Sequence, residues 1–224
     1  MHILLLEDDE LLRDRVLVPR LQKYGFEVTA IGQAADLDRH MKEHKPDIVV
    51  LDVGLPDRNG FDVARELRGQ RADVGIVMLT ARGETTDRVR GLSEGADAYL
   101  SKPVDIDLLA ATLYSLARRL RSSSLCVGQN WRLDAEGWCL LSPSGDIVAL
   151  TQTEGRLLAP LLDTPNQVIP RDVLIGTLTS NVYGFDPHRL EALIHRLRKK
   201  VLHVLGIPLP LNAVPGQGYV LVSR

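Results

Sequence analysis

The chain has 224 residues, of which 45% are hydrophobic and 25% charged, and its formal net charge is −2. This length exceeds the commonest domain size of about 100–150 residues, so two domains are expected, and the ordinary globular composition argues against disorder. Neither a strongly basic nor a strongly acidic balance is present, so a case for nucleic-acid binding must rest on clustered charge. Only Met1 and His2 precede the first apolar stretch, so we expect no signal peptide or membrane span and a cytoplasmic location.

Between residues 1 and 120, apolar runs alternate with amphipathic stretches. The runs are 3–6, 28–31, 48–53, 76–80 and 98–100. Aliphatic residues without polar alternation are typical of strands buried on both faces, as in a parallel sheet covered by helices. Leu109, Leu113, Leu116 and Leu120 recur at helical spacing and predict one buried stripe. This half is therefore predicted to be α/β, a five-stranded doubly wound sheet of the flavodoxin-like type.

The polar triplet at 122–124 predicts a linker, and the pattern changes after it. We place one domain at 1–120, the linker at 121–124 and a second domain at 125–224. Short strand-like runs at 131–133, 138–141 and 147–150, separated by turn residues, predict an antiparallel meander.

Helix signals follow this meander. Thr151 and Glu154 have the spacing of a capping box, and Pro170 and Pro187 suit the first turns of two further helices. A turn and strand at 216–222 close the pattern, which indicates an α+β winged helix-turn-helix domain. Pro19 and Pro160 fall inside helical stretches, where we expect bends or local breaks.

Chemically distinct residues stand where four of the first-half strands end. They are Glu7 with Asp8, Asp52, Thr80 and Lys102. Parallel strands all end at one edge of the sheet, where ligands bind, so these side chains are expected to meet. A carboxylate can attack phosphorus to form an aspartyl phosphate, and Asp52 stands alone at the end of a central strand. Asp52 is therefore the predicted phosphoacceptor.

Phosphoryl oxygens approaching a carboxylate require a cation. Hard oxygen ligands and retained waters suit Mg²⁺, so we predict Asp8, Asp52 and the carbonyl of Gly54 as direct ligands, with Glu7 acting through water. The ammonium of Lys102 and the hydroxyl of Thr80 are expected to bind phosphoryl oxygens. Taken one at a time, however, acids and lysines at strand ends are usually solvated loop residues.

Four segments carry a resemblance. They are Ile3-Leu4-Leu5-Leu6-Glu7-Asp8-Asp9, Asp52-Val53-Gly54-Leu55-Pro56-Asp57-Arg58-Asn59-Gly60, Thr80-Ala81-Arg82 and Gly95-Ala96-Asp97-Ala98-Tyr99-Leu100-Ser101-Lys102-Pro103. Together they resemble the receiver domain of bacterial two-component response regulators. The resemblance implies that a sensor histidine kinase phosphorylates Asp52, that Tyr99 reorients with Thr80, and that the Lys102–Pro103 peptide is cis.

In the second half, residues 186–201 predict an amphipathic helix with Leu190, Ile194, Leu197 and Val201 on its buried face. Basic and histidine side chains occupy the remaining faces. The predicted DNA-binding residues are His188, Arg189, His195, Arg196, Arg198, Lys199 and Lys200. Such a helix fits a major groove, where arginines reach phosphates or guanine edges. On the helix alone, a solvated amphipathic face explains the pattern equally well.

The order of elements favours DNA binding, because it is similar to the DNA-binding domain of the OmpR/PhoB class. The segments that carry this resemblance are 150–154, 168–174, 194–200 and 216–219. It implies a phosphorylation-controlled transcription regulator, not an enzyme, that dimerises and binds promoter double-stranded DNA. RNA polymerase is a further candidate partner, and no membrane partner is implied.

The chain departs from this pattern at several positions. Pro215 replaces the basic residue usual before the wing glycine, and His188 replaces the usual first arginine of the recognition helix. At the family's dimer face the chain keeps three charged residues, Arg88, Glu94 and Asp97, and has uncharged residues where charged partners are usual, Ala98, Leu108 and Thr112.

Three alternatives remain. The first is a regulator that binds DNA without phosphorylation and dimerises through Leu108. The second is an aspartate-nucleophile phosphatase, although such enzymes usually carry a second aspartate where Gly54 stands here. The third is that the basic helix binds protein or RNA.

Overall fold

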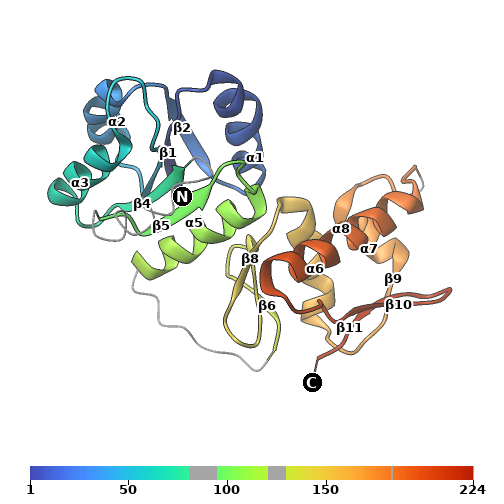
Figure 1. Cartoon of the computed structure of the whole chain (residues 1–224). Coiled ribbons are helices and arrows are strands. Elements are labelled where there is room, and N and C mark those ends of the chain that lie inside the picture. The colour runs from blue at the N-terminus through green and yellow to red at the C-terminus, as the bar shows by residue number, and fades with distance from the viewer. Residues whose placement is uncertain (81–94, 121–129, 183, 224) are drawn as a thin grey trace. The chain divides into compact units, whose positions relative to one another are not determined.

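The computed structural model describes residues 1–80, 95–120, 130–182 and 184–223 (Figure 1). It divides into two compact units, Met1–Ser123 and Ser124–Arg224, and each is described by itself. The predicted linker at 121–124, together with Arg88 and Glu94, lies outside the described residues.

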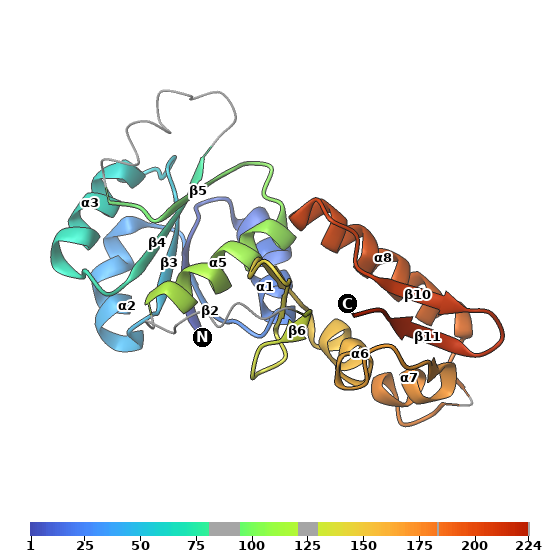
Figure 2. The same ribbon diagram turned by 90° about the horizontal axis from the view of Figure 1, so that it is seen from below.

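The first unit contains a five-stranded parallel sheet in the order β2-β1-β3-β4-β5. Its strands are β1 (His2–Leu6), β2 (Glu27–Ile31), β3 (Ile48–Asp52), β4 (Gly75–Thr80) and β5 (Ala98–Ser101). The described helical segments are η1 (Leu11–Leu17), α1 (Val18–Lys23), η2 (Ala34–Asp36), α2 (Leu37–His44), α3 (Gly60–Gln70) and α5 (Ile106–Leu120). Figures 1 and 2 show α2 and α3 on one face of the sheet and α1 and α5 on the other. The predicted doubly wound sheet is confirmed.

The central strands are buried on both faces, which explains their continuous apolar sequence. On one face, alternate residues of β1, β3 and β4, such as Leu6, Leu51 and Met78, join a core cluster with α2 and α3. On α5, Leu109 and Leu113 are fully buried, as the predicted stripe required. Polar side chains can therefore gather only at the ends of the strands.

The first helix continues through Pro19, but its hydrogen bonding changes from the π to the α pattern one residue before it. Segment η1 is π-helical, and the N–H of Val18 donates to the carbonyl of Arg13, five residues back. Pro19 then lies in the first turn of α1 and has no N–H to donate to the preceding turn. The break expected at Pro160 is not found, because α6 is described in full and continues through it.

In its described residues, the second unit combines three helices with two small antiparallel sheets, ordered β6-β7-β8 and β10-β11-β9. Its strands are β6 (Arg132–Leu133), β7 (Cys139–Leu141), β8 (Ile147–Ala149), β9 (Ile169–Pro170), β10 (Leu211–Val214) and β11 (Gly218–Leu221). Its helices are α6 (Gln152–Asp163), α7 (Arg171–Leu178) and α8 (Pro187–Leu205). Side chains of all three helices and both sheets share one apolar core. The predicted winged-helix architecture is confirmed.

The capping residues predicted from the sequence lie at the starts of α6 and α8. Thr151 and Glu154 form a complete capping box at α6. The Asp186 carboxylate caps α8 by accepting from the N–H of His188, and Pro187 follows in the first turn. Pro170 stands one place earlier than expected, at the N-cap of α7. No helix within the described ranges is both long enough and apolar enough to cross a membrane.

Candidate functional site

The register of the parallel sheet brings the predicted acidic site together at one edge. Asp52 ends β3 and pairs with Leu79 of β4, while Thr80 ends β4 and pairs with Ser101 of β5. Glu7 follows directly after β1, which lies beside β3. Lys102 follows directly after β5, and its N–H donates to the Thr80 carbonyl at 2.7 Å. Residues from four strands therefore meet where a parallel sheet binds its ligand.

Three carboxylates form the centre of this site. One oxygen from each of Glu7, Asp8 and Asp52 lies within 4.8 Å of the others. Glu7 is fully buried and Asp52 is 6% exposed, whereas Asp8 is exposed. Several negative charges this close together, two of them withdrawn from water, require positive charge nearby.

Lys102 supplies part of that positive charge. Its Nζ lies 2.8 Å from Oε1 of Glu7 and 2.8 Å from Oδ2 of Asp52. Burial lowers the pKa of the Lys102 ammonium, but its hydrogen bonds to Asp52 and Glu7 outweigh burial and leave the pKa above its ordinary value. Lys102 is therefore held charged between the two buried carboxylates.

Glu7 has unused capacity for a cation. Burial raises the pKa of its carboxyl group, and the hydrogen bond from Lys102 offsets this only in part. Its buried Oε2 has no hydrogen-bond partner among the described residues. A hard cation bound beside Oε2 would compensate this oxygen, and clustered carboxylates are the donors that Mg²⁺ prefers. The residues present thus fit a divalent-cation site.

Other predicted site residues lie at the same edge or near it. Gly54 is exposed two residues after Asp52, and a Cβ placed on it would stand 3.8 Å from Oδ2 of Asp52. Tyr99, on β5, packs against the core cluster shared with α3. The Lys102–Pro103 peptide is cis, as the resemblance implied.

Sequence reasoning missed two residues that hold the loop after Asp52. The Asp57 carboxylate accepts from the N–H groups of Ala34 and Ala35, at 3.2 and 2.9 Å, and so fastens this loop to η2. Gly60 begins α3 close to the backbone of Asp52, because a Cβ there would lie 2.4 Å from the Asp52 carbonyl oxygen. In the sequence, the only sign of this close approach is that residue 60 is a glycine.

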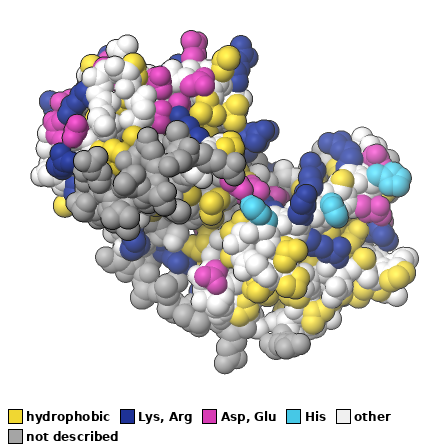
Figure 3. Space-filling model, viewed as in Figure 1, with side chains coloured by type: hydrophobic (Ala, Val, Ile, Leu, Met, Phe, Trp, Pro, Cys, Tyr) yellow, Lys and Arg dark blue, Asp and Glu magenta, His cyan; other side chains and the backbone are white. Residues whose placement is uncertain are grey.

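In the second unit, α8 presents most of the predicted basic residues to solvent. Leu190, Ile194, Leu197 and Val201 are at most 1% exposed and face the core. The predicted contact residues that are exposed are His188, Arg189, His195, Arg196 and Lys199. Figure 3 shows histidine and basic side chains following one another along this helix. The described face of α8 therefore carries basic side chains that would attract a polyanion such as DNA.

Two predicted DNA-binding residues have their charged groups engaged within the domain. Lys200 is 7% exposed, and its Nζ donates to Oε2 of Glu154, the capping-box carboxylate of α6, at 2.8 Å. Arg198 is partly buried and donates through Nε to the Leu211 carbonyl of β10 at 2.9 Å. Both long side chains fold back onto the domain, and their assignment to DNA stays a prediction.

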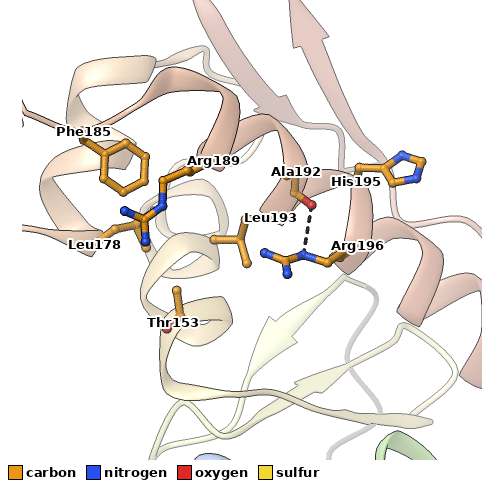
Figure 4. A pocket seen from close by; sticks show the side chains of 8 residues that line it. All are labelled: Thr153, Leu178, Phe185, Arg189, Ala192, Leu193, His195 and Arg196. Atoms are coloured by element: carbon orange, nitrogen blue, oxygen red, sulfur yellow. Dashed lines mark hydrogen bonds between the residues drawn. The ribbon is translucent and has the colours of Figure 1, made fainter.

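A pocket of about 480 Å³ opens beside the N-terminal half of α8. Its lining residues are Thr153, Leu178, Phe185, Arg189, Ala192, Leu193, His195 and Arg196. The Arg189 guanidinium lies 5.3 Å from the centre of the Phe185 ring, and Arg196 donates to the Ala192 carbonyl at 3.3 Å (Figure 4). These contacts hold the guanidinium groups of two residues that line the pocket.

Comparison with known proteins agrees with both halves of this structure. Residues 3–114 match the family model of the response regulator receiver domain, and residues 145–221 match that of the C-terminal domain of transcriptional regulatory proteins. The two-component response regulator PhoP of Pseudomonas aeruginosa is 36% identical over 226 residues, covering 100% of this chain and 99% of the relative. The transcriptional regulatory protein GltR of the same species is 33% identical, covering 99% and 94%. A CheY-like receiver domain protein from Methanospirillum hungatei shares the receiver fold, with 23% identity and a TM-score of 0.51 over 55% of this chain and 98% of that one.

The chain belongs to the two-component response regulators of the OmpR/PhoB class, which join a receiver domain to a winged-helix DNA-binding domain. It is a phosphorylation-regulated, DNA-binding transcription regulator and not a catalytic enzyme. Within this class its whole length aligns with the PhoP regulators of Pseudomonas aeruginosa and Salmonella typhi, the latter at 32% identity. Membership implies a histidine kinase and DNA as partners.

Proposed function

We propose that Asp52 is the phosphoacceptor. An Asp52 carboxylate oxygen attacks the phosphorus of a phosphohistidine on a sensor kinase, a P–O bond forms, and the P–N bond breaks, which leaves the imidazole as the leaving group. Lys102 already lies 2.8 Å from Asp52 and donates to a phosphoryl oxygen, and the hydroxyl of Thr80 donates to another. The observation that carries this assignment is the position of Asp52 between a lysine and two further acids at the end of a central strand.

Mg²⁺ is the proposed cation, held by Asp8, Asp52 and the Gly54 carbonyl, with Glu7 acting through water. When bound, it neutralises the negative charge that builds up between Asp52 and the incoming phosphoryl group. Asp8 is the exposed member of the cluster, so the ion has a path from solvent. The orphaned Oε2 of Glu7 supports a cation at this position.

The proposed output is promoter binding by α8 in the major groove. His188, Arg189, His195, Arg196 and Lys199 are the contact residues that we retain. The hairpin of β10 and β11 is proposed to approach an adjacent minor groove. A homodimer would place two such helices on repeated half-sites. Its affinity for DNA would rise, because binding of one helix increases the effective concentration of the other at the second half-site. RNA polymerase stays a proposed partner. The proposed location is the cytoplasm, where both the kinase domain and promoter DNA would be accessible to the protein.

The dimer contact is proposed to use apolar surface on α5. Leu108 is 43% exposed there, at a position where charged partners are usual in this class. Asp97 is engaged within its own domain, because its carboxylate accepts from Arg68 at 2.6 Å and from Arg119 at 3.3 Å. The exposed Leu108 and the intradomain ion pairs of Asp97 favour a dimer that depends less on ion pairs between subunits. They also keep open the alternative of DNA binding without phosphorylation. The proposed domain limits remain 1–120 and 125–224.

The test compares the wild-type chain with Asp52→Ala in Mg²⁺, with and without a small-molecule phosphodonor. Phosphorylation is expected to increase both the dimer fraction in sedimentation and the affinity for promoter DNA in the wild type, and to change neither in Asp52→Ala. Equal responses of the two proteins would reject Asp52 as the trigger. Unresponsive wild-type protein that already binds DNA as a dimer would favour the phosphorylation-independent alternative.

A further inference from the structure

Three of the chain's six histidines gather in the receiver domain, away from the acidic site. His2 begins β1, and His40 and His44 lie one turn apart on α2. The ring centres of His2 and His44 are 5.6 Å apart, as are those of His40 and His44. Because a strand rises about 3.3 Å per residue, His2 lies about 16 Å along β1 from Glu7. The histidine cluster is thus separate from the proposed magnesium site.

The helix spacing suits metal chelation. Side chains four residues apart lie on the same face of a helix, and histidines so spaced supply two ligands in helical zinc sites. Nδ1 of His40 lies 3.0 Å from the Asp36 carbonyl. A carbonyl oxygen can only accept, so Nδ1 carries a proton, and in the neutral ring Nε2 of His40 then has the lone pair.

The third imidazole is oriented in the same manner. Nδ1 of His2 lies 3.2 Å from the His44 carbonyl and must also donate, so in the neutral ring Nε2 has the lone pair. That nitrogen contacts the hydroxyl of Thr29 at 2.9 Å. A hydrogen bond from one ring nitrogen to a carbonyl is the usual support of a histidine that binds metal through the other nitrogen.

The surroundings also favour a cation. His40 and His44 lie toward the carbonyl end of α2, where the helix dipole attracts positive charge. The Glu43 carboxylate lies 3.9 Å from Nε2 of His44, and Asp47 accepts from the backbone N–H of His2 at 2.8 Å. Among the described residues, only the acidic cluster brings three ligand atoms within 4.8 Å of one another, so His2 must turn away from Thr29 to complete a three-nitrogen site.

We propose that His2, His40 and His44 bind a borderline divalent transition metal, represented by Zn²⁺. Imidazole ligands suit such ions, whereas Mg²⁺ prefers the oxygen ligands of the acidic cluster. His40 and His44 hold the ion, and His2 joins as the third ligand on releasing Thr29. Binding would link the end of α2 to the start of β1, at the end of the sheet opposite Asp52.

The experiment is calorimetric titration of Zn²⁺ into the untagged full-length chain, with excess Mg²⁺ present to occupy the acidic cluster. One ion per chain is expected. Removing an outer hydrogen-bond partner already weakens metal sites about 10–100-fold, so His40→Ala and His44→Ala should each lower the affinity at least about tenfold. The matched control is His203→Ala, which removes another exposed imidazole from the last turn of a helix, α8, and should leave affinity unchanged.

His2→Gln completes the test, because glutamine retains a hydrogen-bonding group near Thr29 but supplies no imidazole. Its Zn²⁺ affinity is expected to fall, while melting curves without Zn²⁺ stay close to the wild type in all four variants. Absence of saturable binding, or wild-type affinity in both His40→Ala and His44→Ala, would overturn the proposal. Wild-type affinity in His2→Gln would overturn the three-histidine site.

Discussion

Replacing Lys200 with methionine asks whether this lysine supports the recognition helix or contacts DNA. The substitution keeps most of the side-chain volume but removes the ammonium that lies 2.8 Å from Glu154. The same Glu154 oxygen also accepts from the N–H and hydroxyl of Thr151, at 2.8 and 3.0 Å, so two of its three donors remain. Removing one member of a buried ion pair costs about 3–5 kcal/mol, and the remaining donors place this case near about 3 kcal/mol. In a domain of about 100 residues, each kcal/mol lowers the melting temperature by about 4–8 °C, so a fall of about 12 °C or more is expected.

The salt dependence of DNA affinity separates the two roles. Each lysine that neutralises a phosphate contributes about 0.9 to the slope of log affinity against log salt. Lys200→Met should leave that slope unchanged at temperatures where the domain is folded. The neighbouring Lys199→Met, at an exposed position, should reduce the slope by about 0.9 and change stability by no more than about 0.5 kcal/mol. A reduced slope with an unchanged melting temperature in Lys200→Met would refute the buried-pair reasoning.

Two further substitutions test the acidic site. Burial raises the pKa of Glu7 above its ordinary value of 4.5, so the folded state binds the proton more tightly, and the free energy of unfolding falls as pH rises through the interval between the two pKa values. Glu7→Gln should therefore raise the melting temperature in EDTA at neutral pH and weaken the stabilisation by Mg²⁺; a lower melting temperature in EDTA would contradict this. Gly60→Ala places a Cβ 2.4 Å from the Asp52 carbonyl oxygen and should destabilise by about 1–3 kcal/mol in urea unfolding, whereas Gly69→Ala, in the same helix with no atom within 4 Å, should not destabilise. Equal stabilities of the two alanine variants would show that the backbone moves aside.

The acidic site was predictable because its geometry follows from strand order. Asp52 and Lys102 are 50 residues apart in the sequence, yet each follows an apolar run, and parallel strands end at a common edge. The buried stripe of α5 and the core face of α8 were predictable for a similar reason, since helical periodicity fixes which residues share a face.

Contacts between distant elements were not predictable in the same way. Periodicity places Lys200 beside the basic strip but does not reveal that its flexible stem reaches Glu154, 46 residues earlier. The hydrogen bonds from Ala34 and Ala35 to Asp57 likewise depend on how two loops meet. Pro19 indicated a disturbed helix, but not that the preceding turns would be π-helical.

The central claim is that Asp52, among the clustered acids of this edge, accepts the phosphoryl group. Incubating the chain with a small-molecule phosphodonor and Mg²⁺, then locating any added mass by peptide mass spectrometry, tests it most directly. We expect one phosphoryl group on the Asp52 peptide after incubation with Mg²⁺, and none when EDTA replaces Mg²⁺ during the incubation. An unmodified Asp52, or modification of Asp8 or Asp57 in its place, would contradict the claim.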